Sequence, residues 1–294
     1  IYRALENTGL TLKDKLKERG FRINNPPEVK FTGLFDTVAS FGLFHFNDTS
    51  QLKLDSIKKS EYTLQLAAAD EHRKKFRRTN IDSVVNSKGC EILLPGTHGD
   101  IGGGCNDYEN ECGKVIMSFE EFETGLTPNQ KIVLENERHR LINEGWYREH
   151  EIEIVYNEPF YTIGNRESSE VMSGYVIVNK KNIRNAYDLI PLHIMAEFAQ
   201  EKGKVNVKAI ALKQYSIHEE LNNLKQAKKE IDLCCPKPGA NGIHSISEKL
   251  KIETLKILRH DYLHFSAQYK MPDYPQFSKG GAEYGKRERV IQDG

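Results

Sequence analysis

The chain has 294 residues, of which 38% are hydrophobic and 29% charged, proportions that are ordinary for a soluble globular protein. Its 42 lysines and arginines balance 42 aspartates and glutamates, so the composition gives no sign of a nucleic-acid partner. No stretch approaches the roughly 20 apolar residues that a membrane-spanning helix needs. A mixed polar segment, unlike a signal peptide, opens the chain at Ile1.

The first part of the sequence alternates predicted helices with predicted buried strands. In chain order these are a helix over residues 1–19 that stops at Gly20, a strand over Val29–Phe35, a helix over residues 60–76 with Ser60 as its cap, and a strand over residues 90–96. Strands separated by helices favour parallel pairing through crossover connections. We therefore expect an α/β fold with a parallel sheet in residues 1–115.

After residue 115 the pattern becomes mostly helical. Helices are predicted over residues 125–152, 183–203, 216–233 and 245–264, with one short strand-like run over residues 174–181. From about Met271 the sequence is rich in glycine, proline and charge, which is typical of an irregular tail. We assign residues 116–294 to a mostly helical region and regard it as a candidate lid or membrane-docking surface.

Two side chains with catalytic chemistry follow predicted strands, Asp36 after TGLF and His98 after ILLPGT. In open α/β sheets, functional groups gather at the carboxyl ends of strands. An acid followed by a histidine is also the order of the last two members of the α/β-hydrolase triad. The acid fixes the imidazole tautomer, and the histidine takes the serine proton and returns it to the leaving group. Asp36 and His98 are therefore the candidate catalytic residues.

Three alternatives accompany this assignment. His264 is a rival catalytic histidine, although its helical context favours a packed structural role. Asp100 is a rival acid, but its place two residues from His98 is awkward for orienting that ring. The acidic residues 70–71 with Arg73 form either an ion-pair cluster that steadies the loop carrying Asp36 or a plain exposed helix face.

The cysteines and one aromatic stretch leave further alternatives open. The sequence has no C-x-x-C pattern, and adjacent Cys234 and Cys235 are poor zinc ligands, so we expect no metal and no cofactor. Cys105 and Cys112 flank a polar loop and are either joined by a disulfide or free. The aromatic stretch over residues 40–46 forms part of the core, or it lines a groove for an acyl chain or a lid.

Three blocks, FTGLFDTVASFG, LAAADEHRKKF and LPGTHGDIGGG, resemble in order and spacing the conserved blocks of the Tle1-like catalytic domain. This domain belongs to type VI secretion phospholipase effectors, which have an α/β-hydrolase fold. The later stretches NAYDLIPLHIMAEFA, LRHDYLHFSA and RERVIQDG resemble its C-terminal landmarks. The resemblance implies that Asp36 is the triad acid and His98 the triad base. It also implies supporting loops that contain Thr37, Asp100, Gly102, Gly103 and Gly104.

The sequence departs from the family pattern in two places. Cys105 stands where the family usually has an aromatic residue. The nucleophile of the family is a serine in a G-x-S-x-G elbow, and no serine of this chain lies in that pattern. The predicted helix over residues 1–19 resembles the helix that follows the elbow. We therefore expect the nucleophile, part of the sheet and the oxyanion hole to lie in a missing N-terminal portion, and this chain alone to be inactive.

The resemblance implies a serine lipase or phospholipase that hydrolyses acyl esters of membrane phospholipids, to which this chain supplies the aspartate and histidine. The expected partners are phospholipid at a membrane surface, the missing N-terminal portion, an immunity protein and a component of the secretion apparatus, with no nucleic acid. The protein would be cytoplasmic in the producer, secreted without a signal peptide, and active at the target-cell membrane from the periplasmic side. The alternative is a non-catalytic binding or interaction module on a hydrolase fold that has lost its serine.

Overall fold

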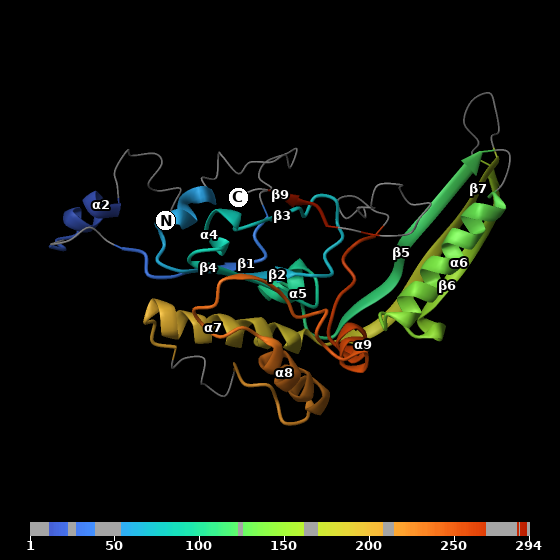
Figure 1. Ribbon diagram of the computed structural model, residues 1–294. Coiled ribbons are helices and arrows are strands. Elements are labelled where there is room, and N and C mark those ends of the chain that lie inside the picture. Colours follow the sequence, from blue (N-terminus) through green and yellow to red (C-terminus); the bar gives the residue numbers. More distant parts are fainter. Residues whose placement is uncertain are drawn as a thin grey trace.

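The fold combines a parallel sheet covered by helices with an antiparallel sheet that projects to one side (Figure 1). It is seen in a computed structural model, which describes residues 12–22, 28–38, 54–122, 126–161, 170–207, 215–268, 287 and 289–292. Side chains from both sheets contribute to one continuous hydrophobic core. No helix in these ranges is both long and apolar enough to cross a membrane.

The parallel sheet has the strand order β1-β2-β4-β8. Its strands are β1 (Thr32–Phe35), β2 (Thr63–Ala68), β4 (Gly89–Leu94) and β8 (Gly242–Ser245). All six residues of β2 and five of the six in β4 are buried, which explains why β4 appears in the sequence as an apolar run without alternation. The predicted α/β fold with a parallel sheet is confirmed.

The predicted helix over residues 60–76 is wrong. Its central residues form β2, and the chain continues without a helix through residue 77. Leucine, glutamine and alanine are good helix formers, and TLQLAA contains all three. However, β2 pairs with β1 on one side and with β4 on the other, so its backbone groups are satisfied within the sheet. Tertiary pairing and burial therefore override the local helix preference.

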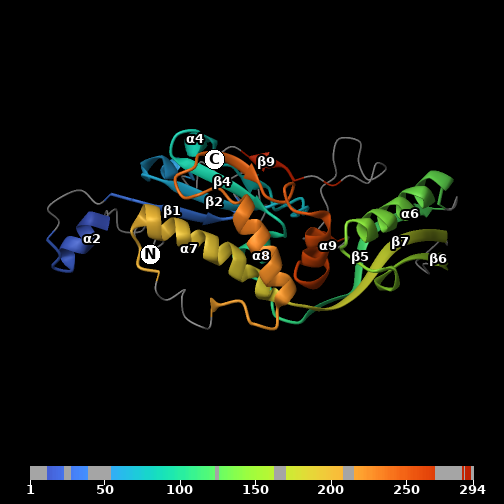
Figure 2. The same ribbon diagram turned by 60° about the horizontal axis from the view of Figure 1, so that its bottom comes forward.

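Helices cover both faces of the parallel sheet (Figures 1 and 2). On one face lie α7 (Leu189–Gly203) and, beyond it, α8 (Asn222–Cys234). On the other face lie η1 (Leu54–Lys59) and α4 (Asp82–Val85). The remaining elements of this part are α2 (Leu12–Glu18), α9 (Ile252–Asp261), η3 (Asn185–Asp188) and the short parallel pair β3 (Arg78–Thr79) and β9 (Ile291–Gln292).

Residues 109–183 form a projecting unit that we call the arm (Figure 2). Its antiparallel strands, in spatial order, are β5 (Glu109–Phe122), β7 (Glu170–Ile183) and β6 (Ile152–Tyr161), and they pack against α6 (Pro128–Asn143). The 3₁₀ turn η2 (Glu149–Glu151) leads into β6. The sequence predicted one helix over residues 125–152 and one strand-like run over residues 174–181 here, which correspond to α6 and β7, whereas β5 and β6 were not predicted. The predicted boundary at residue 115 falls inside β5.

A buried ionic cluster holds the base of the arm against the segment after α9. Lys180 of β7 is fully buried, and its Nζ donates to Leu263 O at 3.1 Å and lies 3.7 Å from Glu111 Oε2. Tyr147 Oη donates to the same carboxylate at 2.8 Å. Burial alone would raise the pKa of Glu111, but Lys180 and Lys114 hold it at about 2. The arm is thus tied by charge to the segment that carries His264.

Candidate active site

Asp36 and His98 meet at the carboxyl edge of the parallel sheet. Asp36 directly follows β1, and His98 lies in the turn after β4, with β2 between the two strands. His98 Nδ1 lies 2.9 Å from Asp36 Oδ2. The two candidate residues are therefore hydrogen-bonded, as their positions at the ends of nearby parallel strands predict.

The carboxylate of Asp36 is fully buried and engaged through both oxygens. Ala68 N donates to Oδ1 at 2.8 Å, and the guanidinium of Arg289 spans both oxygens, with Nη2 2.7 Å from Oδ2. The backbone of Asp36 is left-handed, with a φ of 44°, a conformation that aspartate and asparagine tolerate better than most residues. Asp36 N donates to Leu66 O at 2.7 Å. This turn is therefore fixed to β2 by main-chain contacts.

The surroundings keep Asp36 ionised and select one tautomer of His98. Burial raises the pKa of Asp36, but the hydrogen bonds from His98 and Arg289 and the charge of Arg289 outweigh it and hold the pKa below its usual value. An ionised carboxylate only accepts hydrogen bonds, so the neutral imidazole carries its proton on Nδ1 and a free electron pair on Nε2. The His98 side chain is 34% exposed, which leaves the ring open to a reacting group. This is the state that a general base requires.

His98 is the first residue of a short helix whose N-terminus is capped. α5 (His98–Gly102) starts at His98, and Thr97 is its N-cap. The Asp100 carboxylate accepts from both Thr97 N and Thr97 Oγ1 at 2.8 Å. Asp100 therefore stabilises the backbone of the His98 turn and does not pair with the His98 ring.

Two acidic residues after β2 hold the same turn from the other side. Asp70 Oδ2 accepts from Gly96 N at 2.8 Å, and Glu71 Oε2 accepts from His98 N at 3.2 Å. Glu71 also forms a 2.8 Å ion pair with Arg73. Burial raises the pKa of Glu71, but Arg73 more than compensates and lowers it. Of the two alternatives for this acidic stretch, the structure shows the ion pair of Glu71 with Arg73. The hydrogen bonds of Asp70 and Glu71, however, steady the loop of His98 and not, as predicted, the loop of Asp36.

Phe76 forms an apolar wall beside the imidazole. Its ring meets the His98 ring edge-on, with centroids 5.2 Å apart. Arg73 lies over the Phe76 ring, with Cζ 3.4 Å from the centroid. The Phe76 carbonyl in turn accepts from Arg289 Nε at 2.8 Å. The loop after β2 therefore contacts the imidazole directly and the carboxylate through Arg289.

The rival residues Asp100 and His264 pair with each other. His264 Nδ1 lies 2.7 Å from Asp100 Oδ1, and His264 N donates to Asp100 Oδ2 at 3.2 Å. Both side chains are almost fully buried, at 8% and 2% exposed. This pair joins the segment after α9 to the turn that carries His98, and its burial makes it unsuited to receive a substrate.

The remaining predicted loop residues have structural positions. Thr37 O accepts from Thr79 N at 2.9 Å, which ties the turn of Asp36 to β3. Gly102, Gly103 and Gly104 are exposed. Gly103 is left-handed, with a φ of 70°, and ends α5. A Cβ on Gly102 would meet nothing within 4 Å, so this glycine does not bring the backbone close to another group.

Cys105 lies beside the buried pair of Asp100 and His264. One ligand atom from each of these three residues lies within 4.8 Å of the others, so they could hold a metal ion. Hydrogen bonds already account for this grouping, because Asp100 Oδ1 accepts from His264 and, at 3.7 Å, from Cys105 Sγ. All five cysteines are free, so the disulfide alternative for Cys105 and Cys112 is not the one observed.

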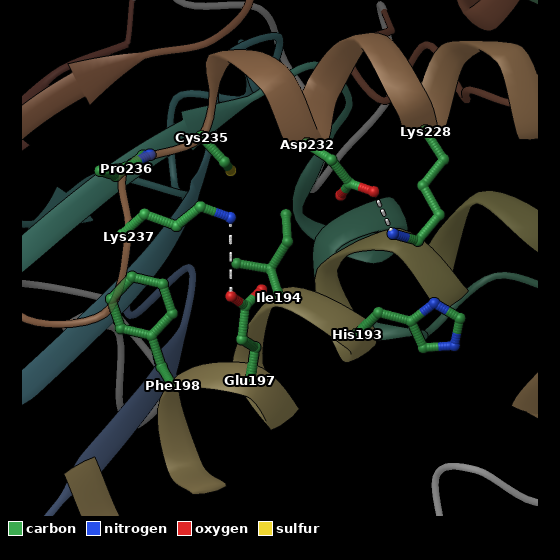
Figure 3. A pocket seen from close by; sticks show the side chains of 9 residues that line it. All are labelled: His193, Ile194, Glu197, Phe198, Lys228, Asp232, Cys235, Pro236 and Lys237. Carbon is green, nitrogen blue, oxygen red and sulfur yellow. Dashed lines mark hydrogen bonds and ion pairs between the residues drawn. The ribbon is translucent and has the colours of Figure 1, made fainter. Parts of the chain in front are cut away.

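A pocket of about 150 Å³ lies between α7 and the end of α8 (Figure 3). Its charged side chains pair with one another, since Lys228 binds Asp232 and Lys237 Nζ lies 3.8 Å from Glu197. Its lining includes neither Asp36 nor His98. This pocket is therefore separate from the candidate site.

The sequence did not indicate that Arg289 surrounds the candidate pair, and it offered the cluster of residues 70–71 with Arg73 only as one of two alternatives. Arg289 could have been suspected only from the RERVIQDG landmark. The described partners of His98 are the carboxylates of Asp36 and Glu71, and no serine hydroxyl is among them. The aromatic stretch over residues 40–46 lies outside the described residues.

Comparisons with known proteins agree with the predicted resemblance. Residues 5–122 match the family model described as "T6SS, Phospholipase effector Tle1-like, catalytic domain". A solved structure described as "Structure of the Tle1 effector bound to the VgrG spike from the Type 6 secretion system" is similar, with a TM-score of 0.65 and 20% identity. The match covers 100% of this chain and 64% of that one. No curated protein matches. The resemblance is thereby confirmed over residues 5–122, and the fold of this chain is similar to that of the Tle1 effector.

Proposed function

We propose that this chain, whose residues 5–122 carry a Tle1-like catalytic domain, supplies the acid and the base of a serine phospholipase. The observation that carries the proposal is the hydrogen bond of 2.9 Å between His98 Nδ1 and a buried, ionised Asp36. It combines a fixed tautomer with an accessible ring, and an aspartate–histidine pair of this kind serves acyl transfer.

In the proposed reaction, His98 Nε2 removes the proton of a serine hydroxyl as the serine oxygen attacks the acyl carbon of an ester. The imidazolium formed is stabilised by the Asp36 carboxylate, which keeps its own negative charge. His98 then gives the proton to the departing alcohol, and water repeats the sequence on the acyl-enzyme. Phe76 limits the movement of the ring during both transfers.

We propose that the serine comes from a segment outside these 294 residues. None of the serines here lies in G-x-S-x-G, and the chain spans 64% of the length of the similar effector. β1 pairs with β2 along one edge, and its other edge has no partner among the described strands. A further parallel strand on that edge would bring its carboxyl end beside Asp36.

The proposed substrate is the acyl ester of a membrane phospholipid, as the family description indicates. The similar effector was solved bound to the VgrG spike, and we propose a comparable delivery partner for this chain, together with an immunity protein in the producer. The site of action would be the target-cell membrane, on its periplasmic side. The role of the region after residue 115 as lid or docking surface remains a prediction.

The test uses the full-length enzyme with phospholipid vesicles, triacylglycerol and short soluble esters. We expect fatty acid release from the vesicles, and loss of that release when the upstream serine, Asp36 or His98 is changed. Hydrolysis of the soluble esters alone would support an ester hydrolase but contradict the proposed phospholipase activity. A full-length protein that lacks any G-x-S-x-G and hydrolyses none of these esters would instead be the non-catalytic module.

A further inference from the structure

Arg289 uses all of its donor nitrogens on the surroundings of Asp36. Nη1 and Nη2 contact the two carboxylate oxygens, Nη1 also donates to Ala68 O at 3.1 Å, and Nε donates to Phe76 O at 2.8 Å. The Arg289 side chain is only 8% exposed. These two main-chain carbonyls fix the orientation of the guanidinium independently of its contacts with the carboxylate.

We propose that Arg289 is a positioning residue of the active site, which orients the Asp36 carboxylate toward His98 and keeps it ionised. This inference rests on the proposed function. Ala68 N holds one oxygen of the buried Asp36 carboxylate. Arg289 contacts both oxygens from a segment 253 residues away and so adds the constraint that fixes the plane of the carboxylate.

The geometry explains why the residue is an arginine. Oδ1 of Asp36 receives Ala68 N and Arg289, and Oδ2 receives Arg289 and His98. A planar fork that bridges both oxygens prevents the carboxylate from rotating, whereas a lysine ammonium would act as one point charge and leave rotation free. Without a cation, burial would favour the protonated acid, which cannot serve His98 as an ionised acceptor.

Arg287 provides a matched control in the same segment. It is also a buried arginine that binds a carboxylate, Glu137 of α6, and its Nη2 donates to Ile116 O at 2.9 Å. Its hydrogen-bonding partners Glu137 and Ile116 lie in the arm, and its guanidinium lies over the ring of Phe265, with Cζ 5.2 Å from the centroid. Changing Arg287 therefore disturbs the segment without removing the guanidinium from the acid.

The experiment compares Arg289→Gln, Arg289→Lys and Arg287→Gln in the full-length enzyme, with kcat, KM and Tm measured across pH. Arg289→Gln should lower kcat roughly 10- to 100-fold, with KM little changed, and should move the acid limb of the kcat–pH profile to higher pH. Millimolar methylguanidinium should restore part of kcat. Arg289→Lys should keep the acid limb near that of the wild type but recover kcat only in part. Arg287→Gln should lower Tm, leave the acid limb in place and show no rescue.

A double-mutant cycle separates positioning from stability. If Arg289 acts through Asp36, Arg289→Gln should reduce kcat no further in an Asp36→Asn background. The inference is overturned if Arg289→Gln lowers only Tm, as Arg287→Gln does, or if the two effects add. Should Arg289→Gln fail to fold, Arg289→Lys in the same cycle decides the question. If Asp36→Asn and His98→Ala leave hydrolysis intact, the proposed function fails instead.

Discussion

His264 Nδ1 lies 2.7 Å from Asp100 Oδ1, so the chain contains a second aspartate–histidine pair close to that of Asp36 and His98. The two pairs consist of the same residue types and are hydrogen-bonded in the same way, but they differ in solvent exposure. The His98 side chain is 34% exposed and that of His264 only 8%. The first pair is open to a reactant, and the second joins two segments of the fold.

Single substitutions should therefore separate the two histidines. In the full-length enzyme, His98→Ala is expected to lower kcat by roughly 10⁴-fold with little change in Tm. His264→Ala should lower the free energy of unfolding by about 1–3 kcal/mol, because it leaves the buried Asp100 carboxylate short of a partner. Vesicle hydrolysis and thermal unfolding measure the two effects. Near-normal turnover in His98→Ala, together with an inactive but folded His264→Ala, would reverse the assignment.

Asp36→Asn should reduce kcat by roughly 10⁴-fold, because the amide cannot hold His98 in the required tautomer. Asparagine tolerates the left-handed backbone, with its φ of 44°, so the turn should survive. Tm should fall, since Arg289 loses the charge of its buried partner. The double variant with His98→Ala should be scarcely slower than either single variant. Additive losses would show that the two residues do not act as a unit.

His72 should make stability depend on pH between about 6.5 and 4. Burial lowers the pKa of His72 to about 4, and the charge of Asp70 opposes this shift. The Nδ1 atom is buried and has no described hydrogen-bond partner, although the residue as a whole keeps some exposed surface. The unfolded chain binds the proton more readily, so this contribution to stability is complete above pH 6.5 and is lost as pH falls toward 4. Its slope is at most about 1.4 kcal/mol per pH unit. Urea unfolding of His72→Gln should show a shallower slope, and an unchanged slope would contradict the assignment.

Thiol reactivity should distinguish the cysteines of the native protein. Cys112 is exposed and should react rapidly with a thiol reagent. Cys90 is buried, and burial raises the pKa of its thiol to about 12, so it should react only after unfolding. Peptide mass analysis after timed alkylation measures the reaction rates of both cysteines. Isolation of a peptide pair joined through Cys105 and Cys112 would show that these two thiols become oxidised.

Two glycines near His98 should respond oppositely to alanine. Gly96 has a φ of 112°, and a Cβ there would lie 3.0 Å from Asp100 Cβ. Gly96→Ala should destabilise the enzyme by more than about 1 kcal/mol and lower kcat, because it displaces the turn of His98. Gly102→Ala should be neutral or slightly stabilising, since open space surrounds it. Equal Tm values for the two variants would contradict this account of the turn.

The sequence predicted the parts of the site that local patterns encode. The strands before Asp36 and His98 are apolar runs, and strand ends of a parallel sheet converge, so the pairing could be foreseen. The helix predicted over residues 60–76 was wrong because pairing on both sides decides the state of β2. Arg289 could not be placed, because no local signal links a residue to a carboxylate 253 positions earlier.

The distance along the chain between Asp36 and Arg289 also sets an order of events during synthesis. The ribosome adds roughly 5 to 20 residues per second, so the carboxylate is made on the order of 10 to 50 s before the guanidinium that neutralises it. Until then the arginine contacts of the Asp36 carboxylate cannot form. The carboxylate therefore gains the guanidinium that orients it only once translation has passed Arg289, and a product that ends before this residue lacks that contact.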